Sequence, residues 1–198
     1  MHRSHSPAVR CPVHVASAIS GLTLPEVMIT LLIISISLAT GVPALDGWLL
    51  RQRAQNDIRQ LQTLIDTTRS LAVNLGSHAT FCPLDNSQRC HLNWNAPLTL
   101  FQDRNGNRQL DANEPVIQQI TAADDQVVRY YPNRALMFNE RGFADLNNGS
   151  LSYCRRLPNN RFGASVWIIS RMGRVRIGRD SNSDGVPETA GGQNIPCD

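Results

Sequence analysis

The feature that most constrains this chain is one long apolar run with a carboxylate at its front. Residues 27–45 include no charged side chain, and Glu26 directly precedes them. As a helix rising about 1.5 Å per residue, the run would be about 28 Å long, close to the thickness of a bilayer core. Burying a lone carboxylate there costs roughly 2–4 kcal/mol. Glu26 therefore needs either an oppositely charged partner or a place at the helix start, where the helix dipole favours it.

The segment before the run is basic. Residues 1–21 carry Arg3 and Arg10 and no acidic side chain, the pattern of a secretory leader whose basic end stays cytoplasmic. Cleavage after the run, at the small residues 42–44, would leave a soluble exported domain. Cleavage at Gly21 would keep the run, and the residues that follow Gly21 favour this second alternative.

Beyond the apolar run, the sequence predicts that the helix continues to about Leu75. Apolar positions recur at three- and four-residue steps, which is typical of an amphipathic helix. Gly76 is the predicted stop, and Pro43 is predicted to kink or locally melt the helix. The positions of the apolar stripe are Ile58, Leu61, Leu64, Ile65, Thr68, Leu71, Ala72 and Leu75.

From residue 79 onward the pattern changes to short runs of β-forming residues separated by Gly, Pro, Asn and Asp. This predicts an α+β fold, in which the long N-terminal helix packs on a globular domain with an antiparallel β-sheet. Residues 180–198 are polar and predicted to be a loop. The candidate strands are 79–81, 98–101, 116–120, 126–131, 135–138, 150–153, 165–170 and 174–178.

Four of the five cysteines fall outside the leader, which contains Cys11. In an exported domain these four favour disulfides, and four cysteines allow three pairings. The favoured pairing joins Cys82 to Cys90 around a local loop and Cys154 to Cys197, which pins the tail. Their spacing is poor for a zinc site.

Two polar loops resemble calcium-binding sequences. In the first, five oxygen-bearing residues fall at ligand positions of an EF-hand loop, although the glycine position is Arg108. The second begins the same pattern at Asp180, with Gly185 correctly placed. Turns built from Asx and Gly residues explain both loops without a metal, so calcium is the weaker interpretation and no cofactor is expected. The five residues of the first loop are Asp103, Asn105, Asn107, Asp111 and Glu114.

The segment 165–179 is predicted to be a hairpin with a positively charged second strand. Alternation places Arg174 and Arg176 on one face and directs Val175 and Ile177 into the core. The two arginines of the leader account for most of the net charge of +3. The rest of the chain is therefore nearly neutral, and the positive patch on this hairpin is local. It suits phosphate contacts without base specificity, although the acidic residues that follow could neutralise it. The arginines are Arg171, Arg174, Arg176 and Arg179.

The stretch around the predicted cleavage site resembles the type IV prepilin signature. Gly21, Leu22 and Glu26 hold its glycine, its first mature residue and its glutamate, although Leu22 replaces the usual phenylalanine and Pro25 an aliphatic residue. The resemblance implies that a prepilin peptidase cuts after Gly21 and that Leu22 is methylated. It further implies that Glu26 pairs with the terminal amine of a neighbouring subunit. The predicted regions are a leader (1–21), a transmembrane and filament-core helix (22–50) and a periplasmic domain (51–198).

The domain itself resembles the FimT/GspH family of minor pilins and pseudopilins. The resemblance rests on the prepilin signature, the Asp/Asn loop, the element Gly173-Arg174-Val175-Arg176, and a cysteine-containing region with Phe81, Cys82, Pro83, Cys90 and Trp94. In the FimT branch the Gly-Arg-x-Arg element is associated with DNA binding during natural transformation.

This resemblance implies a non-enzymatic subunit of a type IV pilus or of a type II secretion machine. Its implied partners are other pilin subunits, the prepilin peptidase, the inner membrane and, in the FimT branch, the DNA backbone. The alternative is a GspH-like pseudopilin without DNA binding. An exported enzyme is disfavoured, because the sequence has no nucleophile motif and only His78 and His91 outside the leader.

Overall fold

The long helix α1 spans Leu24–Leu75 in the computed structural model. The structure describes residues 21 and 23–197, without the side chains of residues 40–46. The chain divides into two units, residues 1–43 and 44–198. The predictions for the leader and for Leu22 concern residues outside the described part of the chain.

The two ends of α1 follow from local sequence. The Val27 N–H donates to the Thr23 carbonyl (3.2 Å), and Pro25 lies in the first turn, where an N–H has no helical partner. At the other end Gly76 has a φ of 57°, and the Ser77 N–H donates to the Ala72 carbonyl (3.2 Å). This closes the last turn as the glycine predicts.

The predicted local melting of the helix at Pro43 is wrong, because helical structure continues through this residue. Proline removes only one N–H from the helix. The alternative, a kink at Pro43, stays a prediction.

In the first unit, the apolar side chains of α1 are exposed. Within the described residues, no helix combines the length and the apolar character that a bilayer crossing requires. An exposed apolar surface of this extent is typical of a segment that packs against other molecules. The exposed residues are Leu24, Val27, Met28, Ile29, Leu31, Leu32, Ile33, Ile34, Ile36 and Leu38.

The second unit contains two antiparallel four-stranded sheets rather than one. Strands β1 (Ala79–Pro83), β2 (Leu98–Gln102), β3 (Val116–Ile120) and β5 (Leu136–Phe138) form a sheet ordered β3-β2-β1-β5. Strands β4 (Val127–Tyr130), β6 (Gly149–Leu157), β7 (Arg161–Ile169) and β8 (Val175–Ile177) form one ordered β4-β6-β7-β8. All eight predicted strands are present, but β6 and β7 extend further than predicted. Short 3-10 turns occupy Asp145–Asn147 and Pro158–Asn160.

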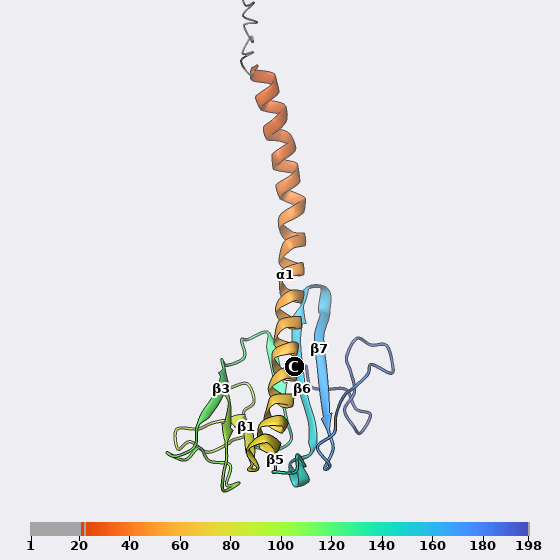
Figure 1. Cartoon of the computed structure of the whole chain (residues 1–198). Coiled ribbons are helices and arrows are strands. Elements are labelled where there is room, and N and C mark those ends of the chain that lie inside the picture. The colour runs from red at the N-terminus through yellow and green to blue at the C-terminus, as the bar shows by residue number, and fades with distance from the viewer. Residues whose placement is uncertain (1–20, 22, 198) are drawn as a thin grey trace, which may run out of the picture. The chain divides into compact units, whose positions relative to one another are not determined.

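The part of α1 that belongs to this unit packs across both sheets. Figure 1 shows it in front of them, with β1 and β3 to one side and β6 and β7 to the other. The apolar stripe is confirmed except at its end, where Leu75 is 48% exposed. The shared core contains Ala54, Leu61, Leu64, Ile65 and Ala72 of α1, Phe81, Leu98, Leu100, Leu136 and Phe138 of one sheet, and Leu151, Tyr153, Trp167 and Ile169 of the other.

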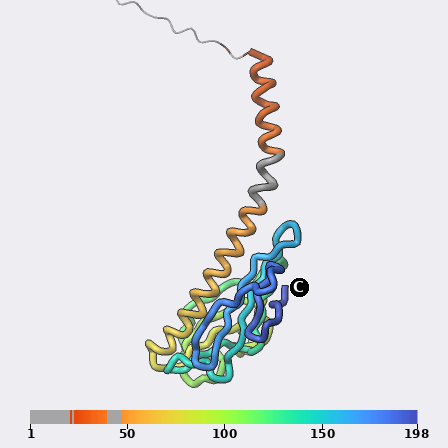
Figure 2. The backbone as a smooth tube through the Cα atoms, turned by 90° about the vertical axis from the view of Figure 1, so that its right-hand side faces the viewer, coloured from red at the N-terminus to blue at the C-terminus, as the bar shows by residue number. Residues whose placement is uncertain are grey.

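A smaller core forms on the opposite face of the second sheet, where the C-terminal tail covers alternate residues of β6 and β7. Cys154, Val166 and Ile168 contact Val186 and Ile195 of the tail. Figure 2 shows the blue tail on the side of the strands away from α1. The Cys154–Cys197 disulfide fastens it, and Cys82–Cys90 closes the loop after β1, so both predicted pairings are confirmed.

A buried arginine ties α1 to the second sheet. Arg155 of β6 is 5% exposed. It forms ion pairs with Asp57 (3.0 Å) and Asp124 (2.9 Å), while the Tyr153 hydroxyl donates to Asp57 (2.6 Å). Burial raises the pKa of Tyr153, so it remains a donor at neutral pH. A buried cation is tolerated only when it is paired in this way.

We expect Asp57→Ala to lower the free energy of unfolding by about 1–3 kcal/mol, because Arg155 then loses half of its charge pairing. Urea unfolding measures the effect. Asp66→Ala is the matched control: it removes an exposed carboxylate of the same helix that only accepts a hydrogen bond from Gln62. Equal stability of the two variants would contradict the role given to Asp57.

Candidate functional site

The predicted arginine element lies on the tight turn that joins β7 to β8. The Gly173 N–H donates to the Ser170 carbonyl (2.9 Å) and the Ser170 N–H to the Arg174 carbonyl (2.9 Å). The Arg174 N–H also donates to Ser170 Oγ (3.1 Å). The Arg171 carbonyl accepts the N–H groups of Ala144 and Asp145 (both 3.0 Å). The turn is thus bound to the neighbouring loop as well as to itself.

Gly173 is required at its position for two reasons. Its φ is +73°, a conformation that favours glycine, and a Cβ there would lie 1.8 Å from the Gly142 carbonyl oxygen. That oxygen already accepts a hydrogen bond from Arg69 Nε (3.1 Å). The glycine of the Gly-Arg-x-Arg element therefore sets the course of the backbone that presents the arginines.

All four predicted arginines are exposed, but they do not face a single hollow. Arg174 precedes β8 and lines a groove of about 750 Å³ beside α1. Arg176 and Arg179 line another, of about 500 Å³, between β8 and the tail. The prediction that Arg174 and Arg176 share one face is therefore corrected, because strand alternation begins only at Val175.

The prediction that Val175 and Ile177 point into the core is confirmed for Val175 only. Val175 packs against the main core. Ile177 is 59% exposed, since β8 is a three-residue edge strand and leaves the core at this residue.

The acidic residues of the tail do not pair with these arginines. Both ion pairs found in the described part of the chain belong to Arg155. Asp180 accepts the Asp184 and Gly185 N–H groups, and both oxygens of Glu188 accept the Ser181 N–H. Hydrogen bonds, above all from Asn194, lower the pKa of Asp184. The carboxylates close their own loop and leave the guanidinium groups available.

The first predicted calcium loop is closed in the same manner. Buried Asp103 accepts the N–H groups of Asn107 (3.1 Å) and Arg108 (3.0 Å) and the Thr80 hydroxyl (2.8 Å). Glu114 accepts the backbone N–H groups of Arg104 and Asp111. Nowhere among the described residues do three or more His, Cys, Asp or Glu side chains gather as a metal site would need. These hydrogen bonds are those of a turn built from Asx residues, the alternative interpretation of this loop.

Two residues of the groove around Arg174 were not predicted. Asp66 and Arg69 of α1 line it together with Arg174. Arg69 lies outside the predicted apolar stripe of the helix, and no local signal in the sequence indicates that β8 lies beside it. At the other end of α1, the predicted assembly residue Glu26 is exposed in the first turn.

An amphipathic helix packed across two antiparallel sheets and preceded by an exposed apolar helical segment defines a pilin-like α+β protein. The sequence model of the family described as "Type II transport protein GspH" matches residues 57–186. This is more than half of the chain, which therefore belongs to the GspH family of minor pilins and pseudopilins.

Two solved structures are similar to this chain, and both are of the type IV minor pilin FimU from Pseudomonas aeruginosa (strain PAO1). The structure in space group P65 has 15% sequence identity to this chain and a TM-score of 0.45. The match covers 63% of this chain and 92% of the FimU chain. The structure in space group P21 has 16% sequence identity and a TM-score of 0.47, and the match covers 65% of this chain and 90% of the FimU chain. A comparison with curated proteins finds no sequence match.

We expect Gly173→Ala to destabilise the domain by more than about 1 kcal/mol, because the new methyl group meets the Gly142 carbonyl at a positive φ. Thermal unfolding measures the loss. Gly191→Ala is the control: the nearest atom to its Cβ is 3.9 Å away, so it should change stability by less than about 0.5 kcal/mol. Equal melting temperatures for both variants would show that the turn tolerates a side chain.

Proposed function

We propose that this chain is a non-enzymatic FimT-like filament subunit whose arginine segment 171–179 binds the phosphate backbone of DNA for uptake. The observation that carries the proposal is the presentation of these arginines. They are exposed and make no ion pair with any described residue. Arg171 and Arg174 lie on the turn fixed by Gly173, Arg176 lies in β8, and Arg179 follows this strand. Arginine is suited to phosphate because its planar guanidinium donates two parallel hydrogen bonds.

The first unit supports the filament part of the proposal. Its exposed apolar helix surface would be covered by the same segment of neighbouring subunits, as in a helical bundle. Glu26 at the helix start would then pair with a neighbour's terminal amine. Cleavage after Gly21, methylation of Leu22 and insertion of residues 22–50 into the inner membrane belong to the same proposal and rest on the sequence.

The second candidate is a pseudopilin of a type II secretion system that does not bind DNA. The observation that favours it is the description of the matching family as a type II transport protein. The helix and the β domain serve either role equally, so the arginine segment separates the two candidates.

A mobility shift with duplex DNA at low salt tests the DNA-binding proposal. We expect Arg174→Gln/Arg176→Gln to weaken binding and to reduce the magnitude of the slope of log K against log salt by about 2, roughly one unit for each phosphate that is no longer neutralised. Gly191→Ala should bind like wild type. Binding by the double variant with unchanged slope, or no binding by wild type at low salt, would leave the pseudopilin role.

Mass spectrometry of the protein recovered from its native host tests processing and assembly. We expect a first residue of methylated Leu22, and we expect Glu26→Leu to be processed normally but excluded from sheared filaments, since the terminal amine then lacks its partner. A mature chain beginning beyond residue 44, or normal incorporation of the variant, would contradict the filament proposal.

A further inference from the structure

A second basic site lies far from the arginine segment in sequence. Three arginines from separate loops, Arg89, Arg108 and Arg134, line a pocket of about 330 Å³ together with Asn107 and Gln109. We propose that this three-arginine pocket is an additional phosphate site that binds the backbone of the same duplex DNA. The inference rests on the proposed function and extends it to a part of the surface outside β8.

The backbone that carries the pocket is held rigidly. The Cys90 N–H donates to the Arg108 carbonyl (3.0 Å) and the Leu110 N–H to the Gln88 carbonyl (2.8 Å), so the disulfide loop and the Asp103–Glu114 loop are joined on both sides of the Arg89–Gln109 bridge. The Arg108 N–H donates to buried Asp103 (3.0 Å).

The backbone on both sides of Arg134, the third arginine of the pocket, is also fixed by neighbouring residues. The Asn133 carbonyl accepts Trp94 Nε1 (2.9 Å), and Asn133 Nδ2 donates to the Asn148 carbonyl (3.0 Å). Ala135 on the other side is 1% exposed. Arg134 therefore projects from a fixed point of the backbone, which limits the entropy lost when it binds a ligand.

The charge of this pocket distinguishes it from the two hollows at β8. No carboxylate of the described residues lines it, whereas Asp66 lines the groove of Arg174 and Glu188 the hollow of Arg176. Arg89 Nε donates to Gln109 Oε1 (3.1 Å), which leaves the rest of its guanidinium open. Within the described structure, the side chains of Arg108 and Arg134 have no hydrogen-bond or ion-pair partner.

Two acids lie near the pocket along the chain, and both accept hydrogen bonds within their own loops. Asp111 Oδ2 accepts Asn105 Nδ2 (2.8 Å) and Asn107 Nδ2 (3.1 Å), the second from the wall of the pocket. Asp85 Oδ1 accepts the N–H groups of Ser87 (2.8 Å) and Arg89 (3.0 Å), so this carboxylate closes the turn before the pocket. Three positive charges without a lining carboxylate favour an anion with several acceptor oxygens, which a phosphodiester provides.

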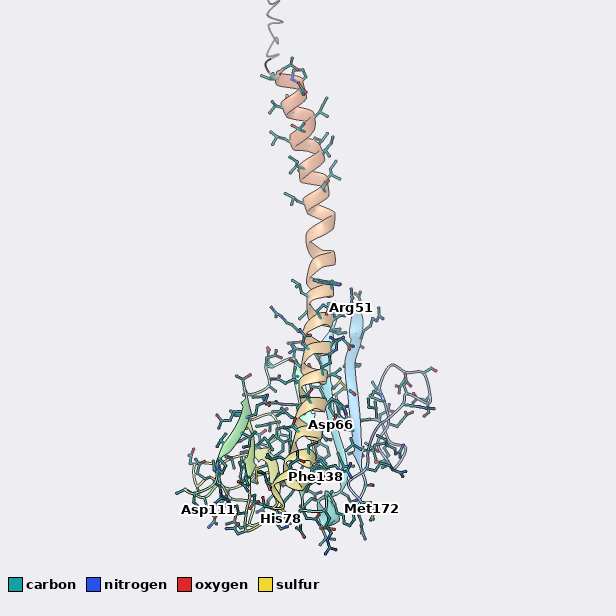
Figure 3. All side chains as sticks on the ribbon, viewed as in Figure 1. Arg51, Asp66, His78, Asp111, Phe138 and Met172 are labelled. Atoms are coloured by element: carbon teal, nitrogen blue, oxygen red, sulfur yellow. A yellow bond between two sulfur atoms is a disulfide. The ribbon has the colours of Figure 1, made fainter. Side chains whose placement is uncertain are left out.

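The loop that contains Arg108 and the β7–β8 turn both lie near the end of the domain where α1 stops. Figure 3 shows Asp111, from the loop that contains Arg108, and Met172, from the turn, on either side of His78 in this view. The His78 carbonyl accepts the Asp103 N–H (3.0 Å), which ties the Arg108 loop to the end of α1. The Gly142 carbonyl, beside the turn, accepts Arg69 Nε of the same helix. A stiff, extended polyanion laid across this end could reach both basic sites.

Salt-dependent binding of duplex DNA by the full-length chain in neutral detergent tests the proposal. We expect Arg108→Gln/Arg134→Gln to weaken binding roughly tenfold at low salt and to reduce the magnitude of the salt slope by about 2. The variant keeps the Arg89–Gln109 hydrogen bond, so the pocket wall should survive, and an unchanged melting temperature checks this.

Arg51→Gln/Arg53→Gln is the charge-matched control. Both arginines are exposed, and Arg51 lies at the opposite end of the domain in Figure 3. This control should keep the wild-type slope. If it loses as much slope as the pocket variant, net charge alone explains the effect and the pocket is not a site.

The outcomes separate this inference from the proposed function. Binding lost in Arg174→Gln/Arg176→Gln but unchanged in the pocket variant would overturn the pocket and leave the DNA-binding role intact. No binding by wild type would overturn both.

Competition experiments with polyphosphate and polyglutamate identify the ligand chemistry. Polyphosphate should compete with DNA for the wild-type protein far better than polyglutamate does. Equal competition that disappears in the pocket variant would instead assign the pocket to an acidic protein partner.

Discussion

Burial of one stripe of α1 against two separate sheets is the constraint on which the domain depends. Among the described residues, no strand of one sheet pairs with a strand of the other, and buried helix residues such as Leu61, Leu64 and Ile65 share a single core with both sheets. Burying each of these side chains contributes roughly 1.5–3 kcal/mol. Polar contacts then set the register of the helix, since Trp167 donates to Gln62 and Arg155 pairs with Asp57.

This arrangement leaves the remaining surfaces free for other roles. The helix covers the inner face of both sheets, and the tail covers the outer face of one through Val186 and Ile195. The loops that carry arginines lie outside these two cores, and their acidic residues accept hydrogen bonds that close turns. A scaffold held by apolar packing thus presents cations on fixed loops without neutralising them.

Local patterns predicted the elements well and their partners poorly. The helix stripe, its stop at Gly76, all eight strands and the Cys82–Cys90 disulfide could be predicted, because each has a local signal. The Cys154–Cys197 disulfide joins residues 43 apart in sequence and follows once Cys82 and Cys90 are paired. The extension of β6 could not, since Arg155 and Arg156 indicate a polar break and the partner of Arg155 lies 98 residues away. The different surroundings of Arg174 and Arg176, the exposure of Ile177 and the second sheet depend likewise on tertiary contacts that no short window contains. The three-arginine pocket could not be predicted for the same reason.

The disulfide between Cys154 and Cys197 affects the stage at which the hollow around Arg176 is fully formed. One wall of that hollow is made of the tail residues Glu188, Thr189, Ala190 and Gly192, and the disulfide fastens the tail to β6. Such bonds persist in oxidising compartments and are rare in the cytosol. A newly made chain in a reducing cytoplasm would therefore lack this covalent lock, and the wall would become permanent only as the protein matures beyond the cytoplasm.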